Sequence, residues 1–167
     1  MGGTQNKPWG VTIRPITGKV VQSFIGRNMG PVDWRVIPLE TMTAAWAMAL
    51  EEALMGTVVS GGPPTVRFWR WDPSAVTIGR FQDVEQEVVL HRCQMNGIDV
   101  VRRMSGGGTT YHDTDREFVF SLTAPEGLFA GDVVGAYTQV LGLVVEALGD
   151  FIPSLPPSLP LQSHHGP

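Results

Sequence analysis

Two arginines, three consecutive glycines and a His-Asp pair lie close together in the stretch RRMSGGGTTYHD. Gly106–Gly108 carry no Cβ atoms, so the backbone can adopt positive φ angles and a ligand can approach the amide groups. Arg102 and Arg103 end a predicted strand and therefore point to opposite faces, so only one of them can share a ligand with those amides. The stretch predicts a phosphate- or carboxylate-binding loop, although a hairpin turn with solvated arginines would use the same residues.

Other glycine and metal motifs fit this stretch poorly. A P-loop would place Lys where Thr109 stands, and a dinucleotide fingerprint would place Gly where Tyr111 stands. No glycine lies two residues before Ser105, which excludes a nucleophile elbow. His112 and Asp113 are adjacent, face opposite ways on a strand and have no third ligand at a telling spacing. We therefore expect His112 to contact a ligand or to be structural, and no metal site is predicted.

The elements around this loop predict an α/β (α+β type) domain with a mixed, largely antiparallel sheet and helices packed on it. The glycine loop is expected to join strands near 98–104 and 117–122. Runs 65–71 and 75–81 are separated by the turn signal Asp-Pro-Ser and predict a hairpin. Helical spacing predicts helices over 41–56, 84–97 and 131–150.

Helix ends and buried faces follow from the same patterns. Gly56 is expected to end the first helix, and Asp132 is expected to cap the last one. The apolar residues at helical spacing, expected to be buried, are Met42, Trp46, Ala49 and Ala53 in the first helix, and Val134, Tyr137, Leu141, Val144 and Leu148 in the last.

Composition restricts the class of protein. The chain has 167 residues, 43% of them hydrophobic and 17% charged, which is typical of one globular domain. The net charge of -4 argues against a nucleic-acid binder. Cys93 is the only cysteine, and the apolar runs are too short to span a bilayer, so we expect a cytoplasmic protein without a membrane segment. We expect an N-terminal extension (1–32), a catalytic domain (33–150) and a Pro-rich disordered tail (151–167).

The motif resembles the R-R-x-S-G-G-G-x-x-x-H-D signature of lipoate-protein ligases, members of the biotin and lipoate ligase family. VRFWRWDPSAVTIGRFQD is similar to the hairpin that precedes the signature, and MTAAWAMALEEAL is similar to the first helix of the family. The absence of a G-R-G-R loop favours the lipoate branch. The resemblance implies a fold like that of class II aminoacyl-tRNA synthetases, with a ligand site at Arg103, Ser105, Gly106, Gly107, Gly108 and His112.

The resemblance also implies a chemistry. Such ligases use ATP with Mg²⁺ to convert lipoate into lipoyl-adenylate, then pass the acyl group to a lysine on the lipoyl-carrier domain of an oxo-acid dehydrogenase or glycine-cleavage protein. An arginine beside a glycine loop supplies positive potential for that reaction. We expect Val76, Ile78, Phe118 and Phe120 to help line an apolar groove for lipoate, although each could equally be ordinary core.

The sequence departs from the family at one charged position. The family places a lysine in a G-x-K-x-x-G segment beyond the glycine loop, whereas Lys7 and Lys19 are the only lysines here. We therefore expect the C-terminal half of the catalytic domain to be missing, and we assign no catalytic residue. A polar residue common in the first helix of relatives is replaced by Ala47.

Three functions remain open from the sequence. The chain can be a lipoate-activating enzyme that either has impaired activity or is completed by a polypeptide that supplies the missing half. It can be an octanoyl or lipoyl carrier transferase, a class that uses a cysteine thioester, but Cys93 precedes the glycine loop. It can also be a non-catalytic remnant that binds without turnover.

Overall fold

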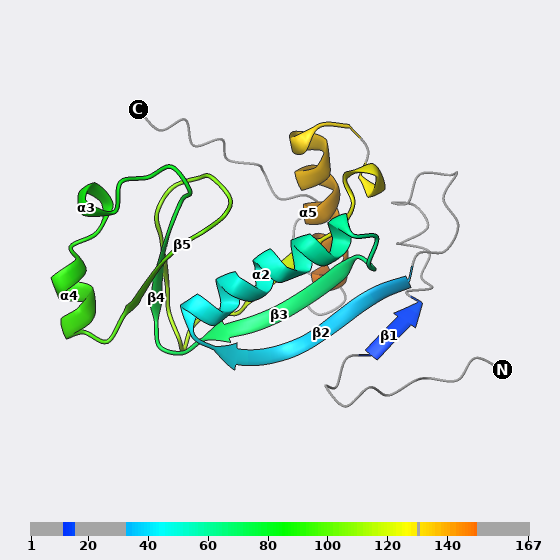
Figure 1. Ribbon diagram of the computed structural model, residues 1–167. Helices are drawn as coiled ribbons and strands as arrows, with labels where there is room; N and C mark the ends of the chain where they lie inside the picture. The colour runs from blue at the N-terminus through cyan, green and yellow to red at the C-terminus, as the bar shows by residue number, and fades with distance from the viewer. Residues whose placement is uncertain (1–11, 16–32, 130, 150–167) are drawn as a thin grey trace. The chain divides into compact units, whose positions relative to one another are not determined.

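The computed structural model describes residues 12–15, 33–129 and 131–149. The chain divides into two compact units, one of residues 1–15 and 33–124 and the other of residues 16–32 and 125–167. The first unit contains two β-sheets and the helices that pack on them (Figure 1). The mixed α/β architecture predicted from the sequence is confirmed.

The first sheet has the strand order β1-β2-β3-β7. Its strands are β1 (Thr12–Pro15), β2 (Asp33–Met42), β3 (Thr65–Trp71) and β7 (Val119–Thr123). Neighbours β1 and β2 are antiparallel, β2 and β3 parallel, and β3 and β7 antiparallel. Alternate residues of β3 are buried, as expected for a strand with one face toward the core. β1 comes from the segment expected to be an N-terminal extension, and it pairs with the sheet.

The second sheet has β4 (Ala75–Ile78) at its centre. β4 runs parallel to β5 (Asp99–Arg102) and antiparallel to β6 (Thr110–His112). All four residues of β4 are buried, which is typical of a central strand covered on both faces. The carboxyl ends of β4 and β5 both lead into the loops that form the candidate site.

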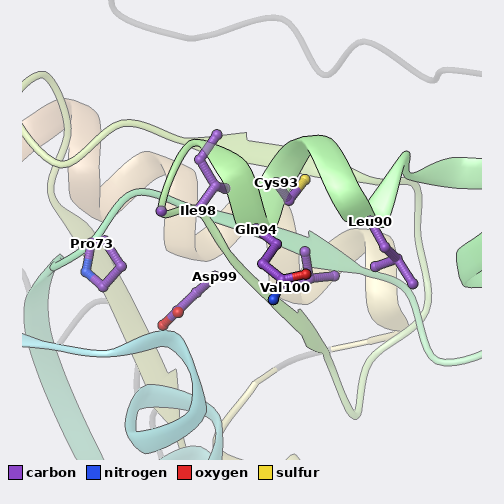
Figure 2. A pocket seen from close by; sticks show the side chains of 8 residues that line it. Pro73, Leu90, Cys93, Gln94, Ile98, Asp99 and Val100 are labelled. Atoms are coloured by element: carbon purple, nitrogen blue, oxygen red, sulfur yellow. The ribbon is translucent and has the colours of Figure 1, made fainter.

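Two short helices connect β4 to β5. They are α3 (Val84–Glu87), whose N-cap Asp83 accepts a hydrogen bond from the Glu85 amide, and α4 (Leu90–Met95). Cys93 of α4 lies among the half-buried residues that pack against the β4 core (Figure 2). A single helix over 84–97 was predicted, and the extended residue Val88 between α3 and α4 corrects that prediction.

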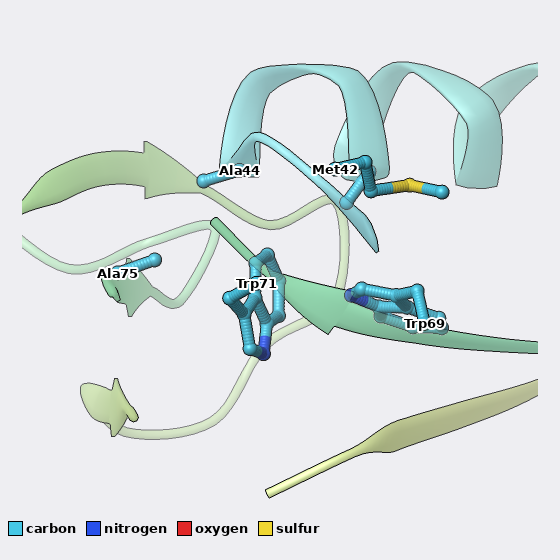
Figure 3. Packing of buried hydrophobic residues seen from close by; sticks show 6 residues of the cluster. Met42, Ala44, Trp69, Trp71 and Ala75 are labelled. Carbon is cyan, nitrogen blue, oxygen red and sulfur yellow. The ribbon is translucent and has the colours of Figure 1, made fainter. Parts of the chain in front are cut away.

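The main core lies between helix α2 (Ala44–Val59) and strand β3 (Figure 1). Ala44 and Ala47 are completely buried and belong to the same core cluster as Trp69 and Trp71. Figure 3 shows Ala44 and the two tryptophans of this cluster. The two indole rings meet edge to face at 5.7 Å between centroids. Small residues on the helix therefore leave room for two large aromatic side chains on the strand.

The N-terminus of α2 is fixed by two side chains. Thr43 accepts a hydrogen bond from the Trp46 amide at 3.4 Å, and Asp99 of β5 accepts one from the Ala44 amide at 3.2 Å (Figure 2). Both side chains satisfy amides that have no partner within the helix, and the Asp99 charge suits the positive end of the helix dipole. The helix is thereby positioned against the second sheet.

The structure corrects the predicted arrangement of strands. Runs 65–71 and 75–81 do not form a hairpin, because β3 pairs with β2 and β7 while β4 pairs with β5 and β6. The glycine loop leads from β5 into β6, a three-residue strand that sequence reasoning missed, and β7 follows later. Parallel pairing joins segments distant in sequence, so local turn signals did not reveal it.

The structure also corrects the predicted helix faces. The first helix continues past Gly56 to Val59, Trp46 is 63% exposed, and the buried residues of α2 are Ala44, Ala47, Leu54 and Val58. The sequence pattern was misleading because alanines, rather than the larger side chains, face the tryptophans of β3.

The second unit contains the 3₁₀ helix η1 (Glu126–Leu128) and helix α5 (Val133–Gly149). Asp132 accepts a hydrogen bond from the Gly135 amide at 2.9 Å, which confirms the predicted cap. Val134 and Tyr137 are each 62% exposed, so the predicted buried face is wrong at these positions. The predicted tail, 151–167, lies outside the described residues. None of the helices in the described part of the chain is long and apolar enough to cross a membrane.

Candidate functional site

A cavity of about 490 Å³ lies where the core meets the glycine loop. This volume is within the range of small-molecule sites, about 300–1,000 Å³. Elements α2, β3 and β7 and the residue after Arg103 supply its apolar wall: Met48, Met55, Trp69, Trp71, Met104 and Val119. Its polar wall consists of Glu51, Thr77, Arg80, Arg103, Ser105, Thr110 and His112. The cavity therefore has a long apolar surface and a polar region that carries both charges.

Arg103 fixes the shape of the glycine loop. Its Nη2 donates to the carbonyl oxygens of Gly108 at 2.7 Å and Gly106 at 3.2 Å. Its Nη1 donates to the Thr77 carbonyl at 3.0 Å and to the Thr77 hydroxyl at 2.7 Å. One guanidinium thus ties strand β4 to the loop, and its planar fork suits several acceptors at once. The glycine carbonyls, rather than their amides, face this cation.

Arg102 holds the neighbouring turn in the same way. Its Nη1 donates to the carbonyl oxygens of Gly79, Arg80 and Gln82 at 2.7–3.1 Å. The two adjacent arginines therefore serve different loops, in agreement with the opposite directions predicted for consecutive strand residues. Both guanidinium groups therefore donate within the protein, although Arg103 also lines the cavity.

The glycine loop packs closely against the turn that follows β4. A Cβ atom at Gly79 would overlap the carbonyl oxygen of Gly107, so only glycine fits at position 79. Gly107 has a φ of 97°, a conformation that residues with side chains rarely adopt. The Arg80 amide also donates to the Ser105 carbonyl at 2.9 Å. These contacts hold the glycine loop and the turn after β4 together.

His112 lies at the cavity wall between two polar partners. Its Nε2 is 3.0 Å from the Thr77 hydroxyl, and its Nδ1 is 2.6 Å from the Glu117 carboxylate. The imidazole also packs on Trp71, with 4.5 Å between ring centroids. His112 is therefore held on three sides, and among the described residues no group of three or more His, Cys, Asp or Glu could hold a metal ion.

A buried ion pair lies behind the apolar wall. Arg67 of β3 is completely buried, and its Nη1 lies 3.2 Å from Oε1 of Glu51 on α2. Ser121 of β7 donates to the same oxygen at 2.6 Å, and the Arg67 guanidinium lies 4.0 Å from the centroid of the Trp69 ring. Burial lowers the pKa of Arg67 from its ordinary value, and the negative charge of Glu51 opposes that shift. Glu51 therefore lines the cavity as a carboxylate that is already paired with Arg67.

Arg80 is the cation with uncommitted donors at the cavity. Within the described ranges its guanidinium has no hydrogen-bond or ion-pair partner, and its recorded contact is with the Phe81 ring at 5.6 Å. Arg80 and Phe81 are both exposed. A negative group of a ligand at the cavity mouth can therefore pair with Arg80 without breaking any contact of Arg103.

Cys93 lies in a different pocket, of about 520 Å³, beside α4 (Figure 2). Its lining, which includes Pro73, Leu90 and Asp99, shares no residue with the cavity at the glycine loop. This second pocket is more open to solvent and has no cationic lining residue. The cationic and polar lining residues, rather than the volume, therefore identify the cavity at the glycine loop as the candidate site. Cys93 packs against the β4 core.

The structure places the six residues predicted for the ligand site in two groups. Arg103, Ser105 and His112 line the cavity, whereas Gly106–Gly108 form the adjacent exposed loop, in which the carbonyls of Gly106 and Gly108 accept from Arg103. Sequence reasoning missed the other lining residues, because Met48, Glu51 and Met55 lie about fifty residues upstream. The helical i, i+3, i+7 spacing of these three was the available signal.

The groove predicted from the sequence has a different lining. Val76 and Ile78 are 9% and 2% exposed and belong to the β4 core. Phe118 and Phe120 are 59% and 39% exposed and do not line the cavity. Their neighbour Val119 lines it instead, because alternate residues of β7 face opposite sides of the sheet.

This combination of fold and glycine-loop cavity agrees with the family resemblance of the sequence motif. Residues 43–154 match the family model "Lipoyl protein ligase A/B catalytic domain". The match covers more than half of the chain, and the protein belongs to this family.

Similar proteins include both transferases and ligases. Octanoyltransferase LipM of Brevibacillus brevis is 36% identical over 113 residues, which are 66% of this chain and 41% of the relative. A crystal structure of lipoate-protein ligase A bound with ATP matches with a TM-score of 0.59 and 29% identity, covering 70% of this chain and 45% of that one. A bi-partite lipoate protein ligase from Thermoplasma acidophilum, described with its E2 lipoyl domain, matches with a TM-score of 0.51 and 28% identity over 70% of this chain and 43% of that one. The chain thus spans less than half the length of these relatives.

Proposed function

We propose that this chain forms the acyl-binding part of an octanoyl or lipoyl transferase site, which moves the acyl group from a thioester to a lysine of a lipoyl-carrier domain. The cavity at the glycine loop carries this proposal, because its apolar wall suits a medium-length acyl chain and its polar region suits the carbonyl end. In the reaction the lysine amine attacks the thioester carbonyl, the C–N bond forms, the C–S bond breaks and the thiol leaves.

The electrostatics of the cavity favour acyl transfer over ATP-dependent activation. Arg102 and Arg103 direct their guanidinium groups to backbone carbonyls, and the charge of Arg67 is already paired with the Glu51 carboxylate at the cavity. Among the described lining residues, the Arg80 guanidinium has no hydrogen-bond or ion-pair partner, whereas Arg103 makes four hydrogen bonds within the protein. A triphosphate needs more positive charge than this, whereas a thioester is neutral. Similarity to octanoyltransferase LipM supports the same choice.

Cys93 is not placed to carry an acyl-cysteine intermediate at the cavity beside the glycine loop. Cys93 lines a separate pocket and packs against the β4 core. An acyl group in the cavity at the glycine loop would therefore have no thiol of the described chain beside it.

A carrier domain is the proposed partner, and the Thermoplasma ligase described with its E2 lipoyl domain supports that class of partner.

ATP-dependent lipoate ligation is the second candidate. Its support is the structural match to lipoate-protein ligase A bound with ATP. In such a reaction ATP with Mg²⁺ would convert lipoate to the adenylate. The sequence from residue 20 onward contains no lysine to contact the acyl phosphate, so this function would need a cation supplied from elsewhere.

One experiment separates these functions. The purified chain is mixed with a lipoyl-carrier domain and either an octanoyl thioester without ATP or lipoate with ATP and Mg²⁺, and the mass of the carrier is followed. We expect octanoylation to be faster than ATP-dependent lipoylation. Cys93→Ser serves as the matched control and should not change octanoyl transfer. Faster ATP-dependent lipoylation would favour the ligase, and transfer lost in Cys93→Ser would restore the acyl-cysteine route.

A further inference from the structure

Four polar side chains form a continuous hydrogen-bonded chain from the β6–β7 connection to the glycine loop. Glu117 Oε1 is 2.6 Å from His112 Nδ1, and His112 Nε2 is 3.0 Å from Thr77 Oγ1. Thr77 Oγ1 is 2.7 Å from Arg103 Nη1, and Arg103 Nη2 is 2.7 Å from the Gly108 carbonyl oxygen. Glu117 does not line the cavity and lies outside the glycine-loop motif, yet it is the last side chain of this hydrogen-bonded series.

Donor and acceptor rules set the direction of each bond. The guanidinium of Arg103 only donates, so Thr77 Oγ1 accepts there and keeps its own proton for another partner. The recorded partner is His112 Nε2, which must then be an unprotonated acceptor. The Glu117 carboxylate only accepts, so His112 Nδ1 carries the proton. With a proton on Nδ1 and none on Nε2, the imidazole matches the acceptor Glu117 and the hydroxyl donor Thr77, and Thr77 can still accept from Arg103.

The alternative tautomer leaves a buried group unsatisfied. If Nε2 carried a proton, Thr77 Oγ1 would accept from both His112 and Arg103, and the hydroxyl proton would have no acceptor recorded among the described residues. Thr77 is 1% exposed, so water cannot readily replace that acceptor. An unsatisfied buried donor is destabilising, which favours the Nδ1–H form.

We propose that Glu117 is a positioning residue that holds the proton of His112 on Nδ1 and so orients Thr77 and Arg103 to fix the glycine loop. Trp71 limits rotation of the imidazole, with 4.5 Å between the ring centroids. Thr77 and His112 are diagonal neighbours on β4 and β6, so the strand pairing itself brings them together. The effect on ligand binding rests on the proposed function, but the position of the proton does not.

The first test reads the tautomer directly. Nitrogen-15 NMR of the labelled full chain distinguishes protonated from unprotonated ring nitrogens, and His112→Asn identifies the signal among the four histidines. We expect Nδ1 of His112 to be protonated and Nε2 to be unprotonated. Glu117→Ala should weaken this preference, because Nδ1–H loses its acceptor and only the Thr77 contact still favours an unprotonated Nε2. Glu117→Gln should keep it, because the amide oxygen can still accept. Protonated Nε2 in the native chain, or an unchanged preference in Glu117→Ala, would overturn the proposal.

The second test measures octanoate binding by titration calorimetry. We expect Glu117→Ala to weaken binding about three- to tenfold, the range for loss of one hydrogen bond, and Glu117→Gln to bind within about twofold of native. Glu85→Ala is the matched control, because Glu85 is an exposed carboxylate on α3. Equal affinity in Glu117→Ala and native protein would contradict the positioning role. Absence of octanoate binding in the native chain would instead contradict the proposed function, while the NMR result would stand.

Discussion

At the scale of single residues, Arg103 and Arg80 carry the same charge but have different predicted roles. Arg103 donates to Thr77 and to the carbonyls of Gly106 and Gly108, whereas Arg80 lines the cavity and its guanidinium has no hydrogen-bond partner among the described residues. We expect Arg103→Ala both to lower the melting temperature and to weaken octanoate binding, because the loop loses its anchor. Arg103→Lys should recover little of the lost melting temperature or octanoate affinity, since one ammonium cannot reproduce the planar fork of a guanidinium.

Arg80→Ala should separate binding from stability. We expect weaker binding of octanoate at an unchanged melting temperature, because Arg80 makes no recorded hydrogen bond through its guanidinium within the described chain. Arg70→Ala, an exposed arginine on β3 outside the cavity, is the matched control. Calorimetric titration and thermal unfolding of the variants check both predictions. If Arg80→Ala binds like native protein and Arg103→Ala loses affinity without losing stability, then Arg103 is the anion ligand, as predicted from the motif.

At the scale of elements, the contact between the glycine loop and the turn after β4 depends on Gly79. We expect Gly79→Ala to displace the loop and to lower stability by more than about 1 kcal/mol, because the new Cβ would overlap the Gly107 carbonyl. Gly56→Ala is the control, since a Cβ there meets nothing within 4 Å and alanine favours the α2 helix by about 0.5–1 kcal/mol. Urea unfolding of both variants measures the difference, and equal stabilities would refute the close approach.

The buried ion pair connects three elements and predicts a larger effect. Arg67→Ala should destabilise the domain by about 3–5 kcal/mol, because it leaves the Glu51 carboxylate without its buried partner. Glu51→Gln should be milder, since its amide oxygen can still accept from Ser121 and Arg67. Urea unfolding with near-ultraviolet circular dichroism checks the order of the variants. A smaller loss in Arg67→Ala than in Glu51→Gln would contradict the assigned role of the pair.

The elements also show which structural features the sequence could predict. Local signals identified β3, β4, β5 and β7, the capped start of α5 and the opposite directions of Arg102 and Arg103. They failed where pairing joins distant segments, as in the parallel pairs β2–β3 and β4–β5, and where a strand has three residues, as β6 has. The motif indicated Arg103, Ser105 and His112 at the cavity but not Glu117, because hydrogen-bond partners outside a motif have no signature in one sequence.

At the scale of the whole molecule, the charge of the site limits the reaction that the 167-residue chain can perform. The family lysine has no counterpart from residue 20 onward, and Lys7 and Lys19 lie outside the described residues. Arg102 and Arg103 donate to backbone carbonyls, so among the described residues Arg80 has the guanidinium most available to a developing acyl phosphate. Loss of one such contact at comparable sites lowers rates roughly 10²- to 10³-fold.

We therefore expect lipoate-dependent ATP–pyrophosphate exchange by the purified chain to be at least about 10²-fold slower than that of a complete lipoate-protein ligase. Octanoate binding, which needs the cavity but not the lysine, should persist in the same preparation and shows that the protein is folded. Addition of a polypeptide that carries a G-x-K-x-x-G segment should raise the exchange rate if that cation is what the site lacks. Exchange as fast as in a complete ligase by the chain alone would show that the described cavity needs no further cation, and would favour ligation over acyl transfer.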